Sequence, residues 1–373
     1  MSRAPDHPNH DLLVTDAAQR IVDVLAGERR HLVVSTSGST GAAKRVAISG
    51  AALRASAVAT YERIGGPGQW LLCLPVDHIA GLQVLARSHL AGSPPVVMDR
   101  AGSFSADEFS QAARQLTAER KYVSLVPTQL HRLLADGAGG AALRTFDTIL
   151  LGGAAAAPTL LQRARAAGLP IVVTYGMTET SGGCVYDGVP LDGVRIQIGP
   201  DGRVLLAGTV LADGYLNADG TLEPLTADAP DGTAGWFHTQ DRGQTVGGRL
   251  ILEGRADDVI ICGGENVPLQ PVTEAAAALL QARGEHREVQ ALGVPDDHWG
   301  QRVVVAVTGS SQALLQDEFS QAVSEAIRAA CGRAATPLAV VQLPRFPTLG
   351  SGKYDRLTLG EQVAEILNRT QVS

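Results

Sequence analysis

Short apolar runs alternate with amphipathic stretches along the first half of the chain. The apolar runs have the length and the branched aliphatic content of buried strands. They comprise residues 32–34, 70–74, 95–98, 122–126, 148–151 and 171–174. The stretches between them repeat apolar residues every three or four positions, which predicts helices. These helices comprise residues 16–27, 49–60, 79–90, 106–119, 128–135 and 158–167. The alternation predicts an α/β fold with mainly parallel sheets flanked by helices.

The pattern changes after the first half. Residues 182–254 contain short apolar segments separated by Gly, Asp and Pro turns, which predicts a small β-rich subdomain. The last third predicts an α+β segment, with helices near 272–283 and 317–331 and strands near 289–294 and 303–307. We therefore expect a large N-terminal domain over residues 1–255. We expect a small mobile α+β domain over residues 256–373, with a hinge near Asp257.

The composition narrows the class of protein. Hydrophobic residues make up 45% and charged residues 18% of the 373 positions, as in ordinary globular proteins. The formal net charge of −7 argues against a nucleic-acid or membrane-surface partner. The four cysteines lack metal or redox spacing, the N-terminal segment is polar, and no apolar run is long enough to cross a bilayer. We expect a cytoplasmic protein with no nucleic-acid partner and no membrane insertion.

A loop rich in hydroxyls and glycines follows the first apolar run. Its sequence, from Ser35 to Lys44, is Ser-Thr-Ser-Gly-Ser-Thr-Gly-Ala-Ala-Lys. Glycines allow backbone N–H groups to converge on an anion, and the hydroxyls and the ammonium can bind phosphate oxygens. A Walker A loop is excluded, because Lys44 is followed by Arg45 and not by Ser or Thr. The loop predicts ATP as the first ligand to test, and the alternative is a surface turn without a ligand.

A second polar segment follows the last predicted strand of the parallel sheet. It is Thr-Tyr-Gly-Met-Thr-Glu-Thr over residues 174–180. Tyr175 can place its ring on a purine, Thr178 can donate to a phosphate, and Glu179 can hold Mg²⁺, which prefers oxygen ligands. The alternative is a polar turn with a core tyrosine. Because ligands bind beyond the carboxyl ends of parallel strands, we expect this segment to meet the phosphate loop, His78 and Gly152 there.

Two further motifs carry single charged residues. Asp241 follows a strand-like run and could accept hydrogen bonds from two ribose hydroxyls, or it could simply end a strand. Lys353 lies in the Gly/Ser-rich turn 347–354, where a solvated lysine is the alternative interpretation.

Together these segments, over residues 32–356, resemble the acyl-adenylate-forming superfamily of acyl-CoA synthetases, luciferases and peptide-synthetase adenylation domains. Segments 74–82, 150–154 and 175–180 are most similar to the ligases that join o-succinylbenzoate to coenzyme A in menaquinone biosynthesis. Only 34 residues precede Ser35, as in short actinobacterial-type members of that group.

The resemblance implies ATP, Mg²⁺ and coenzyme A as ligands, domain alternation about Asp257, and catalysis by Lys353, Thr178 and Glu179. The residues implied to hold the β- and γ-phosphates are Thr36, Ser37, Gly38, Ser39, Thr40, Gly41 and Lys44. The residues implied to contact the nucleoside, the α-phosphate and the metal are Gly152, Gly153, Tyr175, Thr178, Glu179, Asp241 and Arg255. Two departures stand out: Gln240 replaces the usual glycine before Asp241, where we expected a turn, and Val-Pro-Leu-Gln-Pro follows Asn266.

The acyl substrate of that group has a second carboxylate that needs a polar anchor. His78 is the leading candidate, and the alternative is a buried histidine bonded to backbone. Ser181 and Arg87 are further candidates, and Arg87 could instead be a surface charge. The alternatives for the whole chain are another acyl- or aryl-CoA synthetase, an adenylating enzyme that loads a carrier protein, and a non-catalytic nucleotide-binding module. A homodimer is compatible with each of them.

Overall fold

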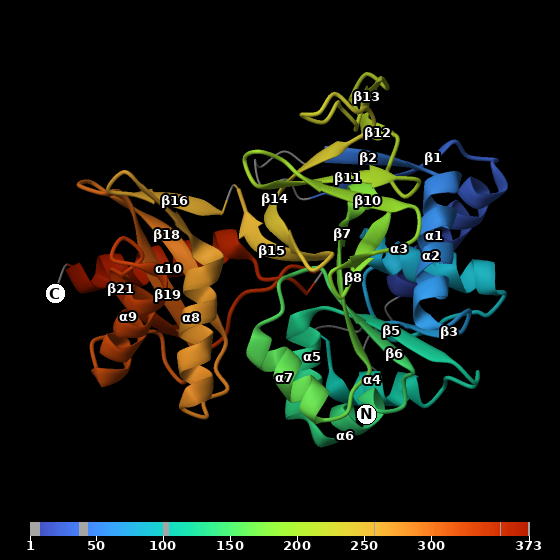
Figure 1. Cartoon of the computed structure of the whole chain (residues 1–373). Helices are drawn as coiled ribbons and strands as arrows, with labels where there is room; N and C mark the ends of the chain where they lie inside the picture. Colours follow the sequence, from blue (N-terminus) through green and yellow to red (C-terminus); the bar gives the residue numbers. More distant parts are fainter. Residues whose placement is uncertain (1–7, 37–43, 100–103, 257, 351, 372–373) are drawn as a thin grey trace. The chain divides into compact units, whose positions relative to one another are not determined.

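The computed structural model describes residues 8–36, 44–99, 104–256, 258–350 and 352–371. These residues form two compact units (Figure 1). The first unit extends to residue 251, apart from 157–159 and 240–244, which belong with the residues from 252 onward to the second unit. The hinge residue expected at 257 lies outside the described residues. The domain limits expected from the sequence stay a prediction.

A sheet in the order β4-β3-β5-β6-β7-β8-β9 forms the centre of the first unit. Strands β3 to β7 pair in parallel, and β8 and β9 add antiparallel strands at one edge. This confirms the mainly parallel α/β sheet. The strands are β3 (Gln69–Leu72), β4 (Val96–Val97), β5 (Lys121–Leu125), β6 (Thr148–Leu151), β7 (Ile171–Met177), β8 (Gly182–Tyr186) and β9 (Val189–Pro190).

Helices occupy the connections between the parallel strands, as the alternation predicts. One predicted helix ends early: α4 ends at Ala113, not near 119, because the backbone N–H groups of Thr117 and Ala118 donate to Gln69 Oε1 at 2.8 and 3.2 Å. Ser49 caps α2 by accepting from Ala52 N, as expected. The helices of this unit are α1 (Pro8–Ala26), α2 (Gly50–Ile64), α3 (Ile79–Ala91), α4 (Ala106–Ala113), α5 (Pro127–Ala135), α6 (Gly137–Leu143) and α7 (Pro158–Ala166).

The phosphate loop belongs to a different sheet from the one we expected. Strand β1 (His31–Thr36) pairs antiparallel with β2 (Lys44–Ser49), and β12 (Gly214–Leu216) and β13 (Leu222–Pro224) complete the order β1-β2-β12-β13. The expectation that the loop follows a strand of the parallel sheet is therefore wrong. The reason is that residues 46–48 form a second apolar strand, which turns the segment into a hairpin before α2 begins.

The β-rich region contributes a further sheet in the order β10-β11-β14-β15. The chain passes from the first unit to the second within its last two strands. Its strands are β10 (Val194–Ile198), β11 (Arg203–Gly208), β14 (Phe237–Val246) and β15 (Arg249–Arg255).

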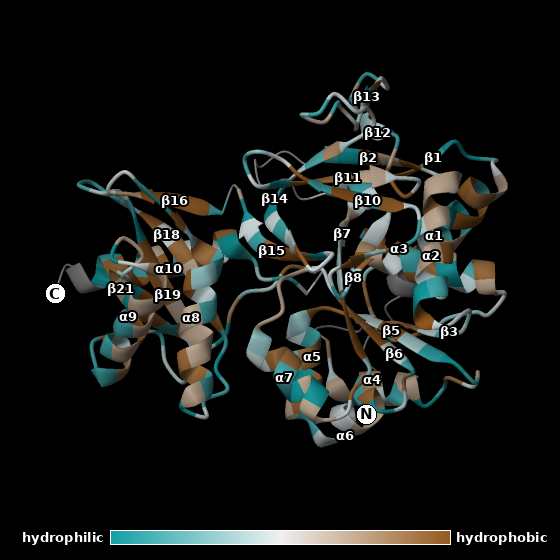
Figure 2. Cartoon of the chain, viewed as in Figure 1, coloured by the Kyte–Doolittle hydropathy of each residue, from teal (hydrophilic) through white to brown (hydrophobic). Residues whose placement is uncertain are grey.

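The second unit has its own α+β core. Its sheet has the order β17-β16-β19-β21-β20, and β18 pairs with β19. In Figure 2 strand β16 is hydrophobic throughout, and Ile261 within it is 57% exposed while Ile260 and Cys262 are buried. The elements are β16 (Val259–Cys262), β17 (Glu265–Pro268), α8 (Leu269–Ala282), β18 (Val289–Asp296), β19 (Gly300–Thr308), β20 (Ala313–Leu315), α9 (Glu318–Cys331), β21 (Ala339–Leu343) and α10 (Arg356–Gln371).

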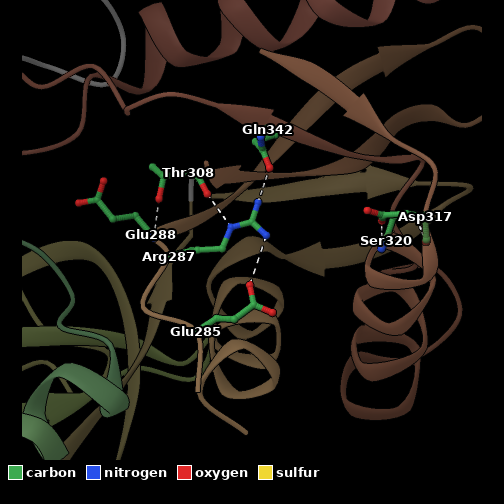
Figure 3. A network of polar contacts seen from close by, with 7 residues as sticks. All are labelled: Glu285, Arg287, Glu288, Thr308, Asp317, Ser320 and Gln342. Atoms are coloured by element: carbon green, nitrogen blue, oxygen red, sulfur yellow. Dashed lines mark hydrogen bonds and ion pairs between the residues drawn. The ribbon is translucent and has the colours of Figure 1, made fainter. Parts of the chain in front are cut away.

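A polar network ties two strands of this sheet together (Figure 3). The Arg287 guanidinium donates to Thr308 O at 2.6 Å and to Gln342 Oε1 at 2.7 Å. Glu285 accepts from the same guanidinium at 3.3 Å. Because every partner is part of the sheet or its connections, the network stabilises the fold.

Within the described ranges, no helix is both long enough and apolar enough to cross a membrane.

Candidate functional site

A tight turn after β7 presents Glu179. Residues 178–180 form one turn of 3₁₀ helix. The Thr180 hydroxyl accepts a hydrogen bond from Met177 N and lies within donating distance of the carbonyl oxygens of Met177 and Gly182. Ser181 then adopts the left-handed region at φ +52°, which lets the chain return as β8. A Cβ on Gly176 would lie 2.1 Å from Gly182 O, so only glycine fits between β7 and this return. The turn therefore fixes where Glu179 points.

Glu179 belongs to a cluster with Tyr215 and Lys44. The Tyr215 hydroxyl donates to Glu179 Oε1 at 3.0 Å. The Lys44 Nζ lies over the Tyr215 ring, 4.6 Å from its centroid. Burial, followed by the charge of Glu179 and the hydrogen bond to it, raises the pKa of Tyr215. The phenol therefore stays protonated and remains a donor to the carboxylate.

The structure describes the two ends of the phosphate loop. Thr36 and Lys44 are paired across the hairpin, and the Thr36 hydroxyl contacts Lys44 O at 3.4 Å. Thr36 is partly buried and Lys44 is exposed. The other predicted phosphate contacts, Ser37, Gly38, Ser39, Thr40 and Gly41, lie outside the described residues. The loop thus begins and ends beside the cluster that contains Glu179.

The donor set around Glu179 fits Mg²⁺ held jointly with a substrate. In the part of the chain that the structure describes, no three His, Cys, Asp or Glu side chains gather as a metal site. One oxygen of Glu179 accepts from Tyr215, which leaves the other for a cation. Mg²⁺ typically keeps waters and takes one or two carboxylates together with substrate phosphates. Glu179 would supply the carboxylate, and a nucleotide bound at the neighbouring loop would supply the phosphates.

The predicted adenine residues lie side by side. Gly152 and Gly153 directly follow β6, which pairs with β7, the strand that contains Tyr175. A Cβ on Gly152 would lie 2.2 Å from Thr174 Oγ1, so glycine allows the two chains to approach here. Gly153 has φ +80°, which favours glycine. The structure therefore brings these residues together, as we expected.

Helix α3 separates the candidate acyl residues into two groups. His78 is the N-cap of α3, with its side chain 39% exposed and Nε2 3.9 Å from Asp77 Oδ1, so the buried-histidine alternative is wrong. Arg87 lies nine residues later, about 13 Å along the helix and half a turn around it. Gln83, one turn before Arg87 on the same face, donates to Ser181 O. Helix α3 thus separates Arg87 from His78, and Ser181 contacts Gln83 on the face that contains Arg87.

Arg87 is buried, which excludes the surface-charge alternative. The residue is 3% exposed, and its guanidinium lies over the Trp70 ring at 5.0 Å from the centroid. Its Nε atom has no hydrogen-bond partner, and among the described residues no carboxylate pairs with it. A buried cation without a counter-ion is costly, so an anionic ligand would stabilise it.

The contacts of Ser181 favour a structural role. Its hydroxyl donates to Val210 O at 2.8 Å, and its carbonyl accepts from Ser56 Oγ at 3.0 Å. The residue is fully buried. Its role as an acyl-pocket residue stays a prediction.

Asp241 and Arg255 face each other in the second unit. Arg255 Nη1 lies 3.5 Å from Asp241 Oδ1, whose side chain is 14% exposed. The turn expected at Gln240 is absent, because 237–246 is one continuous strand and Gln240 O accepts from Ala256 N at 2.7 Å. The bulk of the exposed Gln240 side chain is therefore tolerated, and Asp241 lies within a strand and not after one.

Lys353 lies in a short hairpin of the second unit. Leu349 N donates to Lys353 O at 2.8 Å, and Thr348 and Tyr354 pair as an isolated antiparallel β-bridge. Tyr354 anchors the hairpin, since its hydroxyl donates to Glu288 Oε1 at 3.1 Å. The residue Lys353 as a whole is exposed, yet desolvation by surrounding atoms and then the charge of Arg255 lower the pKa of its ammonium. These bonds hold the backbone of the hairpin, and the catalytic role of Lys353 stays a prediction.

Sequence reasoning missed two of these residues. Tyr215 lies in Ala-Asp-Gly-Tyr-Leu over 212–216, where a polar turn followed by an aromatic residue was the available signal. Gln83 is a buried polar residue of α3, and its Oε1 has no partner. A polar residue at an apolar position of the helical period was the signal there.

The sequence of this chain is similar to those of known proteins. The family model described as AMP-binding enzyme matches residues 12–216. A probable 2-succinylbenzoate–CoA ligase of Mycobacterium tuberculosis (strain H37Rv) is 44% identical over 343 residues, covering 89% of this chain and 84% of the relative. The 2-succinylbenzoate–CoA ligase of Salmonella typhimurium is 33% identical over 340 residues, covering 88% of this chain and 68% of the relative.

Solved structures are similar as well. A variant of Escherichia coli MenE with bound OSB-AMS matches with a TM-score of 0.69 and 28% identity, over 89% of this chain and 68% of that one. The o-succinylbenzoate CoA synthetase MenE of Bacillus subtilis, in complex with the acyl-adenylate intermediate OSB-AMP, matches with a TM-score of 0.69 and 26% identity. That match covers 89% of this chain and 69% of the other.

Proposed function

The chain belongs to the family of AMP-binding enzymes, and from that premise we propose that it joins o-succinylbenzoate to coenzyme A through an acyl-adenylate formed from ATP. The two relatives named above support the substrate, since both are named for it. The observation in this chain that carries the proposal is Arg87, a buried cation with an unpartnered Nε atom. A substrate with a second carboxylate supplies the missing negative charge.

The first step joins the acid to AMP. A carboxylate oxygen of the substrate attacks the α-phosphorus of ATP, the bond from that phosphorus to the bridging oxygen breaks, and pyrophosphate leaves. Phosphoryl chemistry of this kind depends on positioning and charge neutralisation and needs no protein nucleophile. Lys44 and the phosphate loop bind the β- and γ-phosphates, Thr178 donates to the α-phosphate, and Lys353 stabilises the charge that develops. Mg²⁺ on Glu179 neutralises phosphate charge when bound.

The nucleoside is held by two groups of residues. Tyr175 places its ring on the adenine, and Gly152 and Gly153 leave room for the base because they have no side chains. Asp241 accepts hydrogen bonds from the ribose hydroxyls, and Arg255 beside it supports their orientation.

The second step transfers the acyl group to sulfur. The coenzyme A thiolate attacks the acyl carbon, the bond to the AMP oxygen breaks, and the thiol proton goes to solvent. AMP is a far better leaving group than the oxide of a free carboxylate, which is why the adenylate is needed. Rotation about Asp257 would withdraw Lys353 after the first step and open the path for the thiol.

The second carboxylate of o-succinylbenzoate is held by Arg87. A guanidinium binds a carboxylate through two parallel hydrogen bonds, and the burial of Arg87 strengthens them. His78, half-exposed at the other end of α3, is free to contact the reacting end of the acid or the nucleotide.

A substrate panel tests the proposal. The chain is assayed for ATP–pyrophosphate exchange with o-succinylbenzoate, 4-oxo-4-phenylbutanoate, benzoate and medium-chain fatty acids. 4-Oxo-4-phenylbutanoate keeps the ring, the ketone and the aliphatic carboxylate but has a hydrogen in place of the ring carboxylate. Because the buried Arg87 would then lack a partner, we expect kcat/KM for this analogue to be about 10²-fold or more lower than for o-succinylbenzoate.

The variant Arg87→Gln tests whether Arg87 causes the preference for an acid with two carboxylates. We expect KM for o-succinylbenzoate to rise by about 10²-fold, while exchange with 4-oxo-4-phenylbutanoate stays within about threefold of the wild type. Equal use of both acids by the wild type would contradict the substrate assignment. Product AMP that appears with a carrier protein but not with coenzyme A would contradict the thiol acceptor.

A further inference from the structure

We propose that Tyr215 is a positioning residue that holds the metal-binding carboxylate of Glu179 with its hydroxyl and the phosphate-binding Lys44 with its ring. This inference rests on the proposed function, because it assigns Glu179 to Mg²⁺ and Lys44 to the nucleotide phosphates. Tyr215 itself contacts neither the acid nor the adenine in this assignment. It sets the distance between two groups that must act on the same polyphosphate.

The backbone fixes the position of Tyr215. It is the central residue of β12, and it pairs with Val46 of β2, two residues after Lys44 (Figure 1). A Cβ on the preceding Gly214 would lie 2.1 Å from Glu223 O, so β13 packs tightly against β12 at this point. Because β12 lies between β2 and β13, the tyrosine cannot move without disturbing the sheet that bears the phosphate loop.

The turn that contains Glu179 is tied to the same strand by a separate bond. Ala212 N, three residues before Tyr215, donates to Glu179 O at 2.8 Å. The side chain of Glu179 then accepts from the Tyr215 hydroxyl at 3.0 Å. The backbone of Glu179 is therefore held by the segment before β12, and its side chain is held by β12 itself.

Each end of the tyrosine suits its partner chemically. The phenol donates its proton to one carboxylate oxygen, which orients the other for a cation. The ring face attracts the Lys44 ammonium without neutralising its charge, as a carboxylate would. The same ammonium can therefore also contact a phosphate.

The two contacts can be separated by substitution. Tyr215→Phe keeps the ring beneath Lys44 and removes the hydrogen bond to Glu179. Tyr215→Leu removes both contacts. Tyr122→Phe is a control, since it also removes a tyrosine hydroxyl, but one that donates to backbone oxygens (Gly66 O at 3.0 Å and Ile64 O at 3.4 Å) and not to Glu179.

Binding of ATP is measured by titration calorimetry at increasing Mg²⁺ concentrations. For Tyr215→Phe we expect metal-free ATP to bind within about twofold of the wild type, and the Mg²⁺ concentration for half-maximal tightening to rise about tenfold, the effect of losing one hydrogen bond to a charged group. For Tyr215→Leu we expect an additional loss of about threefold in metal-free ATP affinity. Tyr122→Phe should titrate like the wild type.

The outcomes separate this inference from the proposed function. Wild-type Mg²⁺ dependence in Tyr215→Phe overturns the inference, while pyrophosphate exchange by the wild type still supports the function. Wild-type ATP binding without exchange for any acid overturns the function, and the calorimetric comparison still decides the role of Tyr215. Equal changes in Tyr215→Phe and Tyr122→Phe, together with equal losses of melting temperature, identify a structural effect and overturn the inference.

Discussion

At the scale of single residues, buried and desolvated charges carry most of the chemical information in this chain. Arg87 could be interpreted in two ways from its position on a predicted helix, and only its 3% exposure decides between them. Lys353 was placed in a Gly/Ser-rich turn, yet Tyr354 and Glu288 hold the hairpin that carries it. In both cases the sequence supplied the residue type, and only the structure showed its surroundings.

The desolvation of Lys353 predicts a pH dependence. The pKa of its ammonium lies below that of an ordinary lysine, so the proton is present at low pH and is lost earlier as pH rises. If the cation assists adenylation, the exchange rate falls with rising pH through that lowered pKa. Pyrophosphate exchange is measured between about pH 7 and pH 10, below the ordinary lysine value of about 10.4.

The variant Lys353→Arg is the control for that profile. Its guanidinium keeps its proton over the whole range, so the alkaline decline should disappear even if the maximal rate is lower. An unchanged decline in Lys353→Arg would show that another group titrates.

At the scale of elements, turns decide where the reactive side chains point. The turn after β7 bends sharply because Gly176, Ser181 and Gly182 occupy positions that few residues tolerate. The sequence motif located this turn correctly. The hairpin β1–β2 was not expected, because its second strand contains only three buried residues and looked like part of the approach to α2.

Gly176→Ala tests the turn. Its new Cβ would meet Gly182 O at 2.1 Å and force β8 away from β7. We expect a loss of about 1–3 kcal/mol in the free energy of unfolding, as for other overpacked sites. Adenylation should fall by about tenfold or more, because Glu179 moves with the turn. Denaturant unfolding and pyrophosphate exchange measure the two effects.

Gly137→Ala is the matched glycine control. It lies at the start of α6, and a Cβ there meets nothing within 4 Å. Its stability should be unchanged or higher by up to about 1 kcal/mol, since alanine favours helices. Equal losses in Gly137→Ala and Gly176→Ala would contradict the steric explanation.

At the scale of the whole molecule, the predicted site residues belong to both compact units. Lys44, Tyr175 and Glu179 belong to the first unit, and Asp241, Arg255 and Lys353 belong to the second. Next to the expected hinge, Arg356 pairs with Asp258 at 2.7 Å, which ties the start of α10 to the segment after residue 257. Movement of the second unit would therefore carry Lys353 with it.

The two half-reactions separate the roles of the lysine and the hinge. Lys353→Ala should slow adenylation by about 10²–10³-fold, the effect of one charged donor, and spare thiolysis of supplied acyl-adenylate. Asp257→Pro should leave adenylation measurable and suppress the coenzyme A step. Rapid-quench assays of each step measure these rates. Equal loss of both steps in Lys353→Ala, or unchanged overall turnover in Asp257→Pro, would contradict domain alternation.

The sequence by itself determined the parallel α/β core, the Glu179 turn and the family, because apolar periodicity and short motifs are local properties of the chain. Only the tertiary structure decided that the phosphate loop closes a hairpin, that Arg87 is buried, and that Tyr215 joins Lys44 to Glu179. Those facts depend on contacts between residues as far apart as 44 and 215, which no local pattern encodes.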